Sequence, residues 1–158
     1  MPIPEFVVDL RAKIGHDLLW LPAVTAVVRR DDQVLCVQRA DNQRWAPVTG
    51  ILDPGEEPAV GALREVLEET GVVARVDRLV SAGAGDDNWV THLNGDRAVY
   101  LDLTFACTWL SGEPYAAADE SLDARWWPAT ALPPMHPVLR ERIDAALSDE
   151  VAARFRSS

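Results

Sequence analysis

Residues 58–70, PAVGALREVLEET, carry the clearest helical pattern in the chain. Pro58 suits the first turn of a helix, and Gly71 suits the left-handed position that commonly ends one. Apolar side chains recur at intervals of three and four residues and form one stripe along the segment: Ala59, Ala62, Leu63, Val66, Leu67 and Thr70. Strand-like runs precede and follow the segment, so we expect this helix to cross over a β-sheet.

Three glutamates lie on the other side of this predicted helix. On a wheel of about 100° per residue, Glu65, Glu68 and Glu69 fall within one arc opposite the apolar stripe. Their charges repel one another, Arg64 is the one cation in the segment, and the negative end of the helix dipole is close to Glu68 and Glu69. A divalent cation would offset these penalties, because Mg2+ prefers oxygen ligands and leaves positions for water and phosphate. The helix alone leaves a metal site and a solvated acidic face as equal alternatives.

The remaining segments predict strands and helices in mixed order. Strand patterns cover the ranges 21–28, 33–38, part of 44–53, 72–81, 89–93, 98–109 and 121–127. The first two strands are expected to form a hairpin, and helices are expected at 4–15 and 138–148. Hairpins together with a crossover helix favour an α/β (α+β) architecture, a mixed β-sheet flanked by helices. The length fits a single domain, 1–158, with an N-terminal helical extension at 1–16 and a C-terminal helix within 136–150.

Charge, hydropathy and cysteine content exclude several classes of function. The net charge is −10, which opposes binding to duplex nucleic acid but permits a small anionic substrate when a cation lies between them. No apolar run reaches the ~20 residues of a membrane helix, and the N-terminus does not resemble a signal peptide, so no membrane partner is expected. Cys36 and Cys107 lie in apolar runs and are expected to be buried thiols of a cytoplasmic protein, with no disulfide or zinc site.

Residues 50–72, GILDPGEEPAVGALREVLEETGV, combine glycine, acidic and arginine residues at fixed spacing. The segment resembles the signature of the Nudix hydrolases, a family that includes MutT-like proteins, at every defined position: Gly50, Glu56, Arg64, Glu65, Val66, Glu68, Glu69, Gly71 and Val72. Weaker resemblance covers most of the remaining chain. The resemblance implies an α/β/α sandwich, which agrees with the mixed sheet expected above. It also implies a Mg2+-dependent hydrolase of phosphoanhydride bonds, with Mn2+ as a possible substitute.

The resemblance further implies a metal site. The backbone carbonyl of Gly50 would bind the metal together with the carboxylates of Glu65, Glu68 and Glu69, of which Glu69 is similar to the most direct ligand. Glu65 is also similar to the residue that activates water in several members. Glu120 resembles a distal acid that joins the metal site or serves as the base in some members, so Glu65 and Glu120 remain alternative bases.

Three other positions of the signature would support this site. Arg64 would hold the catalytic glutamate in place, Glu56 would tie the loop to the helix, and Gly71 would end the helix. The metal would neutralise the phosphate oxygens, orient a water molecule and stabilise the leaving phosphate.

The substrate class is less constrained than the reaction. Members of the family commonly have Pro-Gly-Gly before the loop, whereas this chain has Pro47-Val48-Thr49-Gly50, which puts the loop path and the substrate shape in doubt. ADP-ribose enzymes have a proline about fifteen residues beyond the signature, and this chain has none in that region. The tyrosine of dinucleoside polyphosphate enzymes is also missing there. A (deoxy)nucleoside triphosphate therefore leads by elimination, and ADP-ribose or another sugar nucleotide is the alternative.

Five residues outside the signature are candidates for binding the substrate. Arg39 and Arg44 could bind phosphates, Trp89 and Tyr100 could stack on a base, and Asn94 lies in a loop that could select the substrate. Each has an ordinary alternative as a surface or packing residue. A catalytically silent nucleotide sensor on the same fold is the rival from another class, and a diphosphate isomerase would require a reactive cysteine. The N-terminal helix could cover the sheet or join a homodimer.

Overall fold

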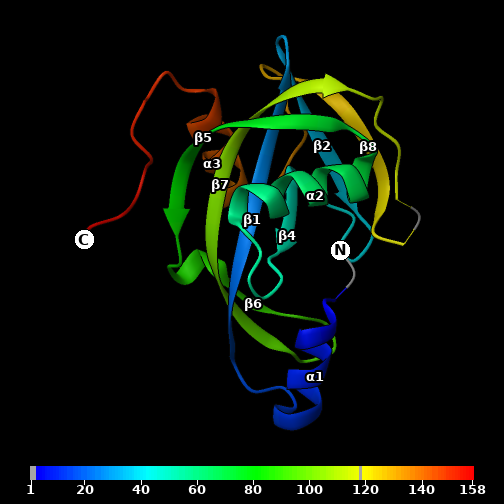
Figure 1. The fold of residues 1–158 in the computed structure, drawn as a ribbon, viewed down its shortest axis with the longest axis vertical. Coiled ribbons are helices and arrows are strands. Elements are labelled where there is room, and N and C mark those ends of the chain that lie inside the picture. Colours follow the sequence, from blue (N-terminus) through cyan, green and yellow to red (C-terminus); the bar gives the residue numbers. More distant parts are fainter. Residues whose placement is uncertain (1–2, 118) are drawn as a thin grey trace.

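The computed structural model describes residues 3–117 and 119–158 of the chain. These residues form a curved eight-stranded sheet with helices around it (Figure 1). The elements in chain order are α1 (Glu5–Ile14), β1 (Leu19–Arg30), β2 (Gln33–Arg39), β3 (Trp45–Ala46), β4 (Val48–Ile51), α2 (Pro58–Thr70), β5 (Val73–Gly83), the single 3₁₀ turn η1 (Asp86–Asn88), β6 (Trp89–Thr91), β7 (Arg97–Ser111), β8 (Ser121–Pro128) and α3 (Pro137–Leu147). The predicted helix at 58–70 and the mixed order of elements are confirmed.

Strand β1 organises the sheet, in which the central strand order is β3-β2-β1-β7-β5. It runs parallel to β7 along nearly its whole length, whereas its other neighbours are antiparallel, so the sheet is mixed as expected. The predicted hairpin of β1 and β2 is paired only at its turn, through Arg29 and Arg30. Beyond that turn the two strands separate, and β4 takes the free edge of β1 opposite Ala23–Ala26. The fork between β2 and β4 was not visible in the sequence pattern.

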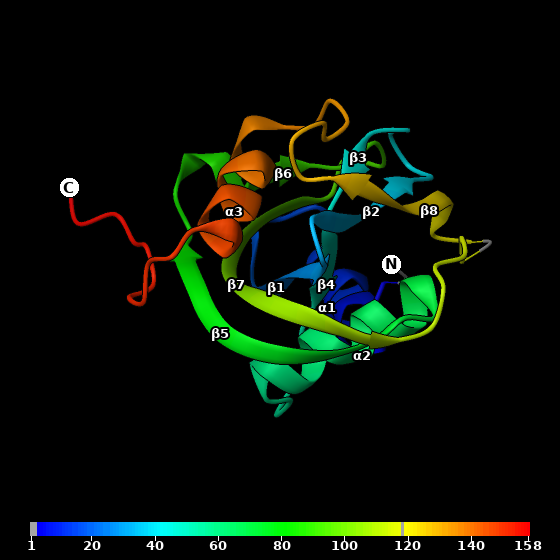
Figure 2. The same cartoon turned by 90° about the horizontal axis from the view of Figure 1, so that it is seen from above.

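The two longer helices lie on opposite faces of β1, because successive residues of a strand point to opposite sides. Val24 and Val28 belong to the apolar cluster that contains Val66 of α2, while Val27 packs with Ile143 of α3. Figure 2 shows the curved sheet from above, with α2 and α3 on different sides of β1 and β7. The arrangement is a sandwich of helices around a mixed sheet.

The orientation of α2 corrects the predicted helix face. Leu67, placed on the buried stripe, is 52% exposed, whereas Glu65 and Glu69, placed on the opposite face, are 3% and 5% exposed. The helix is rotated about its axis relative to the prediction, and the residues that point inward include Ala62, Val66 and Thr70 together with the two glutamates. The hydrophobic period fixes a stripe but does not reveal that two carboxylates border the buried side.

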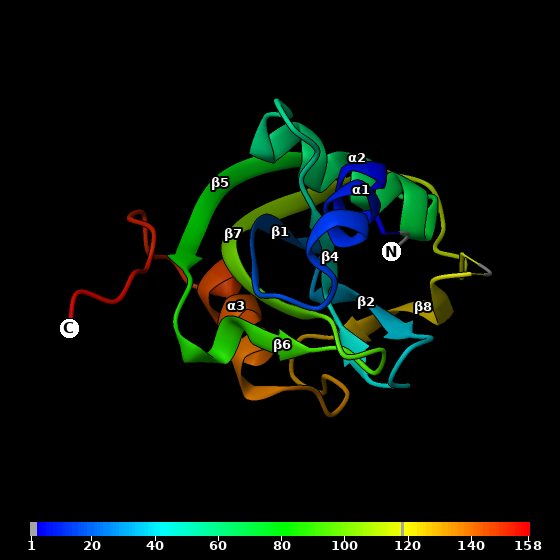
Figure 3. The same cartoon turned by 90° about the horizontal axis from the view of Figure 1, so that it is seen from below.

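Helix α1 covers one end of the sheet near β6 (Figure 3). Val7 is buried and packs with Leu19, Leu21 and Ile51, so α1 contributes to the core of this chain. Beyond α3, the C-terminal segment runs beside β5, where Arg154 forms an isolated parallel bridge with Ser81. Among the described residues, no helix has the length and apolar character needed to cross a membrane. A homodimer stays a prediction.

Gly71 allows a test of how α2 ends. Its φ of 70° lies in the left-handed region, and a Cβ atom would lie 2.0 Å from Cε1 of Tyr115. We expect Gly71→Ala to lower the free energy of unfolding by more than the roughly 1–2 kcal/mol of a left-handed alanine alone, because the Tyr115 ring must also move. Urea denaturation followed by circular dichroism measures the loss.

Gly55→Ala is the matched control. Gly55 has a φ of 84°, but nothing lies within 4 Å of the position of its Cβ atom. This variant should show the conformational loss alone. Equal losses in the two variants would contradict the steric role of Tyr115.

Candidate active site

The site begins with a close contact between β4 and α2. A Cβ atom on Gly50 would lie 2.1–2.2 Å from the Cγ, Cδ and Oε1 atoms of Glu65, so any other residue at position 50 would displace that side chain. The missing side chain at Gly50 thus allows the Glu65 carboxyl group to lie directly against the strand. This contact explains the burial of Glu65 that the helical pattern did not predict.

Glu65 and Glu69 lie one helical turn apart on the buried side of α2. Oε2 of Glu65 is buried and accepts no hydrogen bond from any residue that the structure describes. Burial raises the pKa of Glu65 to about 7, and the negative charges of Glu68 and Glu120 add to this effect against the opposing Arg64. Burial also raises the pKa of Glu69, with contributions from Glu65 and Glu120. Two carboxyl groups that repel each other when ionised are therefore held where little water reaches them.

Arg64 connects the loop, the helix and the buried carboxyl groups. Its Nε and Nη2 atoms donate to the two oxygens of Glu56 at 2.7 and 2.9 Å, and Oε2 of Glu56 accepts the backbone N–H of Asp53 at 3.1 Å. Its Nη1 atom donates to Glu65 at 2.9 Å and to Glu68 at 3.0 Å. The contacts that the resemblance implied for Arg64 and Glu56 are thus present, and they raise the pKa of the guanidinium.

The expected cluster of three carboxylates is only partly assembled. Within residues 3–117 and 119–158, no three His, Cys, Asp or Glu side chains are placed to hold a metal ion. The Glu68 side chain is 49% exposed, and the Arg64 guanidinium lies between it and Glu65. Nevertheless, the donor set fits a divalent cation. The buried Glu65 oxygen without a partner and the neighbouring Glu69 are hard oxygen donors whose mutual repulsion a cation would remove.

Glu120 approaches the same carboxylates from a distant part of the chain. It precedes β8, and its backbone oxygen accepts the N–H of Ala40 at 3.1 Å, which ties this segment to the end of β2. Its negative charge contributes to the raised pKa of both Glu65 and Glu69. Glu120 is therefore close enough to influence both buried glutamates, and its role as a distal acid stays a prediction.

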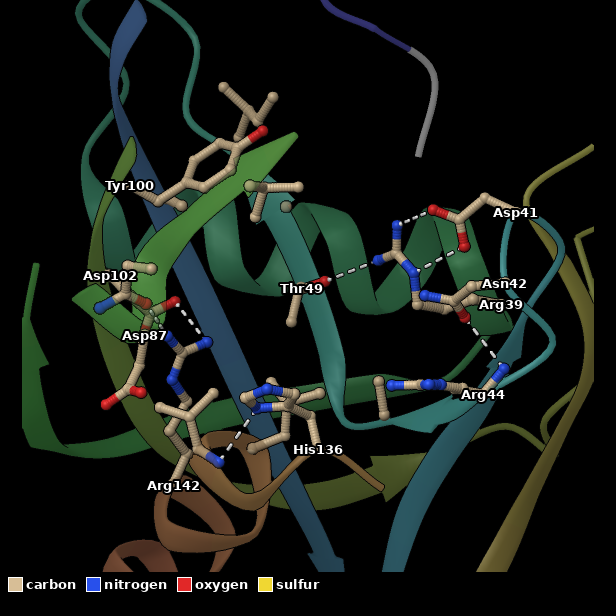
Figure 4. Close-up of a pocket in the computed structure, with 18 of the residues that line it drawn as sticks. Arg39, Asp41, Asn42, Arg44, Thr49, Asp87, Tyr100, Asp102, His136 and Arg142 are labelled. Carbon is tan, nitrogen blue, oxygen red and sulfur yellow. Dashed lines mark hydrogen bonds and ion pairs between the residues drawn. The ribbon is translucent and has the colours of Figure 1, made fainter. Parts of the chain in front are cut away.

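A cavity of about 370 Å³ is lined by Gly50, which lies against Glu65, and by Arg39, but not by the glutamates themselves (Figure 4). Thr49 and Gly50 of β4 form one wall, and Asp102 of β7 and Arg142 of α3 form another. Arg39 lies at the fork between β2 and β4, where it donates to both oxygens of Asp41 and reaches Oγ1 of Thr49 at 3.5 Å. The hydrogen bonds that Arg39 donates to Asp41 are the main cause of its raised pKa, and the charge of Glu69 also contributes. Arg39 thus lies between the cavity and the buried carboxylates.

The other substrate-binding candidates divide into two groups. Arg44, Tyr100 and Trp89 line the cavity, but the register places Trp89 opposite Val99, on the other face of β7 from Tyr100. Tyr100 is therefore the better placed of the two aromatic residues.

Asn94 does not line this cavity, and its part in substrate binding stays a prediction. Its side chain binds Asp96 through both the Asp96 carboxylate and the Asp96 backbone N–H, each at 3.0 Å. Asn94 stabilises the turn between β6 and β7. The sequence Asn94-Gly95-Asp96 is typical of a turn.

The sequence patterns missed a buried polar group at the inner end of the cavity. Arg142 forms an ion pair with Asp102 at 3.2 Å, and their side chains are 12% and 5% exposed. Thr25 and Asn88 complete the group, because each accepts a hydrogen bond from Arg142. One signal was present, since Asp102 is an isolated charge within a long apolar strand.

Known proteins resemble this chain over the residues that form the site. The family model of the NUDIX domain matches residues 19–147, which include both walls of the cavity and the whole of α2. The chain belongs to the Nudix family. A MutT-like protein of Streptomyces ambofaciens is 47% identical over 100 residues, which are 63% of this chain and 58% of that protein. An NAD-capped RNA hydrolase of Pseudomonas aeruginosa is 32% identical over 136 residues, which are 80% of this chain and 44% of that protein.

Solved Nudix structures share the fold at low sequence identity. An ADP-ribose pyrophosphatase from Streptococcus suis gives a TM-score of 0.66 at 22% identity, with coverage of 86% of this chain and 98% of that one. A UDP-X diphosphatase gives a TM-score of 0.64 at 24% identity, with coverage of 90% and 68%. The chain spans about half the length of the curated relatives it matches. Nudix hydrolases act on small nucleotide-derived substrates and generally use divalent metal ions.

The raised pKa of Glu65 predicts how stability depends on pH in the absence of divalent metal. A carboxyl group with a pKa of about 7 in the folded state and about 4.5 in the unfolded chain keeps its proton more strongly when folded. Its contribution to stability is therefore complete below pH 4.5 and is lost as pH rises through 7. We expect the free energy of unfolding to fall by at most about 3 kcal/mol per such group between pH 5 and pH 8.

Urea denaturation in the presence of a chelator measures this dependence. Glu65→Gln should reduce the fall, because glutamine does not titrate, whereas Glu57→Gln, at an exposed position, should leave it unchanged. An identical pH dependence in Glu65→Gln and the wild type would contradict the assignment to Glu65.

Proposed function

We propose that this Nudix protein is a Mg2+-dependent pyrophosphohydrolase that cleaves a phosphoanhydride bond in a nucleoside diphosphate linked to another group, with Mn2+ as a possible substitute. One observation carries the proposal. Glu65 and Glu69 are buried, Glu65 lies against Gly50, and Gly50 and Arg39 line the same cavity. Burying two neighbouring carboxyl groups, with Oε2 of Glu65 without a hydrogen-bond partner among the described residues, is costly for stability, and such an arrangement is typical of a functional site.

The glutamates would perform two tasks. Glu65 and Glu69, with Glu68 and the Gly50 carbonyl, would hold the cation, which supplies charge neutralisation at the phosphate oxygens. Glu65 or Glu120 would accept the proton of the attacking water, and the raised pKa of Glu65 suits such an acceptor near neutral pH. Arg64 would keep Glu65 in place, because it is itself fixed by Glu56.

The cavity gives the substrate an orientation. Arg39 and Arg44 would bind phosphate oxygens near Thr49, because a guanidinium matches the geometry of phosphate. The nucleoside would extend along the cavity from there, with Tyr100 on its wall as a stacking surface. Burial raises the pKa of Tyr100, so its ring stays neutral at physiological pH.

A (deoxy)nucleoside triphosphate is the leading substrate class. This choice rests on two missing residues: the proline typical of ADP-ribose enzymes and the tyrosine typical of dinucleoside polyphosphate enzymes. ADP-ribose or another sugar nucleotide is the alternative within the same reaction. A diphosphate isomerase is disfavoured because Cys36 and Cys107 are buried, which raises the pKa of each thiol to about 12.

The experiment is a screen with Mg2+ of nucleoside triphosphates, sugar nucleotides and dinucleotides, in which released phosphate and pyrophosphate are measured. Hydrolysis of at least one triphosphate, lost on addition of a chelator and restored by Mg2+, is the expected result. Binding of nucleotides without any hydrolysis would favour the catalytically silent sensor instead.

Glu69→Gln provides the sharper test within an active preparation. We expect kcat to fall at least 100-fold, because the amide removes a charged oxygen donor while it keeps the shape of the side chain. Circular dichroism and the melting temperature should show that the fold is retained. Glu57→Gln is the matched control in the same segment and should keep wild-type turnover. Turnover of Glu69→Gln within a few fold of the wild type would remove Glu69 from the metal site.

A further inference from the structure

The buried pair of Asp102 and Arg142 lies at the inner end of the cavity and has no part in the chemistry proposed above. Asp102 belongs to β7 and Arg142 to α3, and both line the cavity. Asp102 accepts hydrogen bonds from Thr25 and Thr104, each at 2.7 Å, in addition to its ion pair with Arg142. The carboxylate is thus fully engaged within the protein, and its position is fixed.

The guanidinium of Arg142 is held in place, but not all of its N–H groups donate hydrogen bonds. Nη1 donates to Thr25 at 3.0 Å and Nη2 donates to Asn88 at 2.5 Å, while Asp102 balances the charge next to Nη1. A guanidinium has five N–H groups. Within the described part of the chain, the hydrogen bonds of Arg142 come from Nη1 and Nη2, so Nε–H and one N–H of Nη2 have no hydrogen-bond partner. Arg142 therefore combines a rigid position with donors available to a ligand in the cavity.

The distance from the phosphate end of the site suits a nucleoside. Ala23 of β1 is paired with Ile51 of β4 on one side and with Asp102 of β7 on the other. Two strand spacings, about 10 Å in total, therefore separate β4, where Thr49 and Gly50 lie, from the strand that carries Asp102. A nucleotide with its phosphates beside Thr49 and Arg39 would direct its base toward Arg142.

We infer that Arg142, held in place by Asp102, is a specificity-determining residue that donates hydrogen bonds to acceptor atoms of the nucleotide base. The inference rests on the proposed function, since it assigns the base of that substrate to the inner end of the cavity. A guanidinium pairs with two neighbouring acceptors such as O6 and N7 of guanine, whereas cytosine presents a donor amino group at its corresponding edge. Guanine nucleotides should therefore be preferred over cytosine nucleotides.

A purely structural role explains these observations less well. A buried ion pair can often be replaced by apolar residues without loss of stability, so stability alone does not require a charged pair in the wall of a cavity. The two arginines at the other end, Arg39 and Arg44, are separated from this pair by the length of the cavity, and only Arg142 is close to the expected base.

The test compares GTP with CTP in wild type, Arg142→Lys and Arg142→Met. The ratio of kcat/KM for GTP to that for CTP should be about tenfold or more in the wild type and should fall at least fivefold in both variants. The change should lie in KM, with kcat for GTP altered less than twofold, because Arg142 is remote from Glu65 and Glu69. Arg142→Lys keeps the charge beside Asp102 but not the planar pair of donors, so a structural role would be rescued by lysine and base recognition would not.

Arg140→Lys is the matched control, because Arg140 lies on the same helix and forms an exposed pair with Asp144. It should keep the wild-type ratio. Melting temperatures identify any variant that fails to fold. Calorimetric binding of GDP and CDP to wild type and Arg142→Lys tests the same preference without hydrolysis, so a failure of the proposed reaction is distinguished from a failure of this inference. An unchanged preference in Arg142→Lys, or no preference in the wild type, would overturn the inference.

Discussion

The contact between Gly50 and Glu65 is the constraint on which the arrangement of the site depends. Because Gly50 has no side chain, α2 can place a carboxyl group against β4 and bury it. This orientation also buries Glu69 and turns Leu67 toward solvent, so the buried face is rotated relative to the one expected from the hydrophobic period. The burial then raises the pKa of both carboxyl groups and creates the demand for a cation that the Nudix chemistry uses.

The fork in the sheet connects two parts of the site that lie on different faces. Glu65 lies on the side of α2, while Asp102 and Arg142 lie on the side of α3. Strand β1 changes its partner from β2 to β4 along its length, and Arg39 occupies the opening between these two strands. A polyphosphate bound at this opening would reach the carboxylates with one end and leave its other end in the cavity.

The two buried groups of charges show opposite electrostatic designs. Asp102 and Arg142 neutralise each other, and hydrogen bonds with Thr25 and Asn88 hold the pair in a fixed geometry without a ligand. Glu65 and Glu69 have the same sign, and only Glu65 has the help of Arg64. The first group suits recognition, since it is rigid, and the second suits metal-dependent chemistry, since a bound cation would relieve its repulsion while both carboxyl groups are ionised.

The sequence by itself determined the bounds of α2, the mixed character of the sheet, the burial of the cysteines and the Nudix signature, because all of these depend on local periodicity and fixed spacing. Only the tertiary structure decided which side of α2 is buried and that β1 runs beside β7. It alone brought Asp102 and Arg142 together, since 40 residues separate them and no local pattern records such a contact. Pairing between distant segments depends on how whole elements pack, and that information lies outside any short window of sequence.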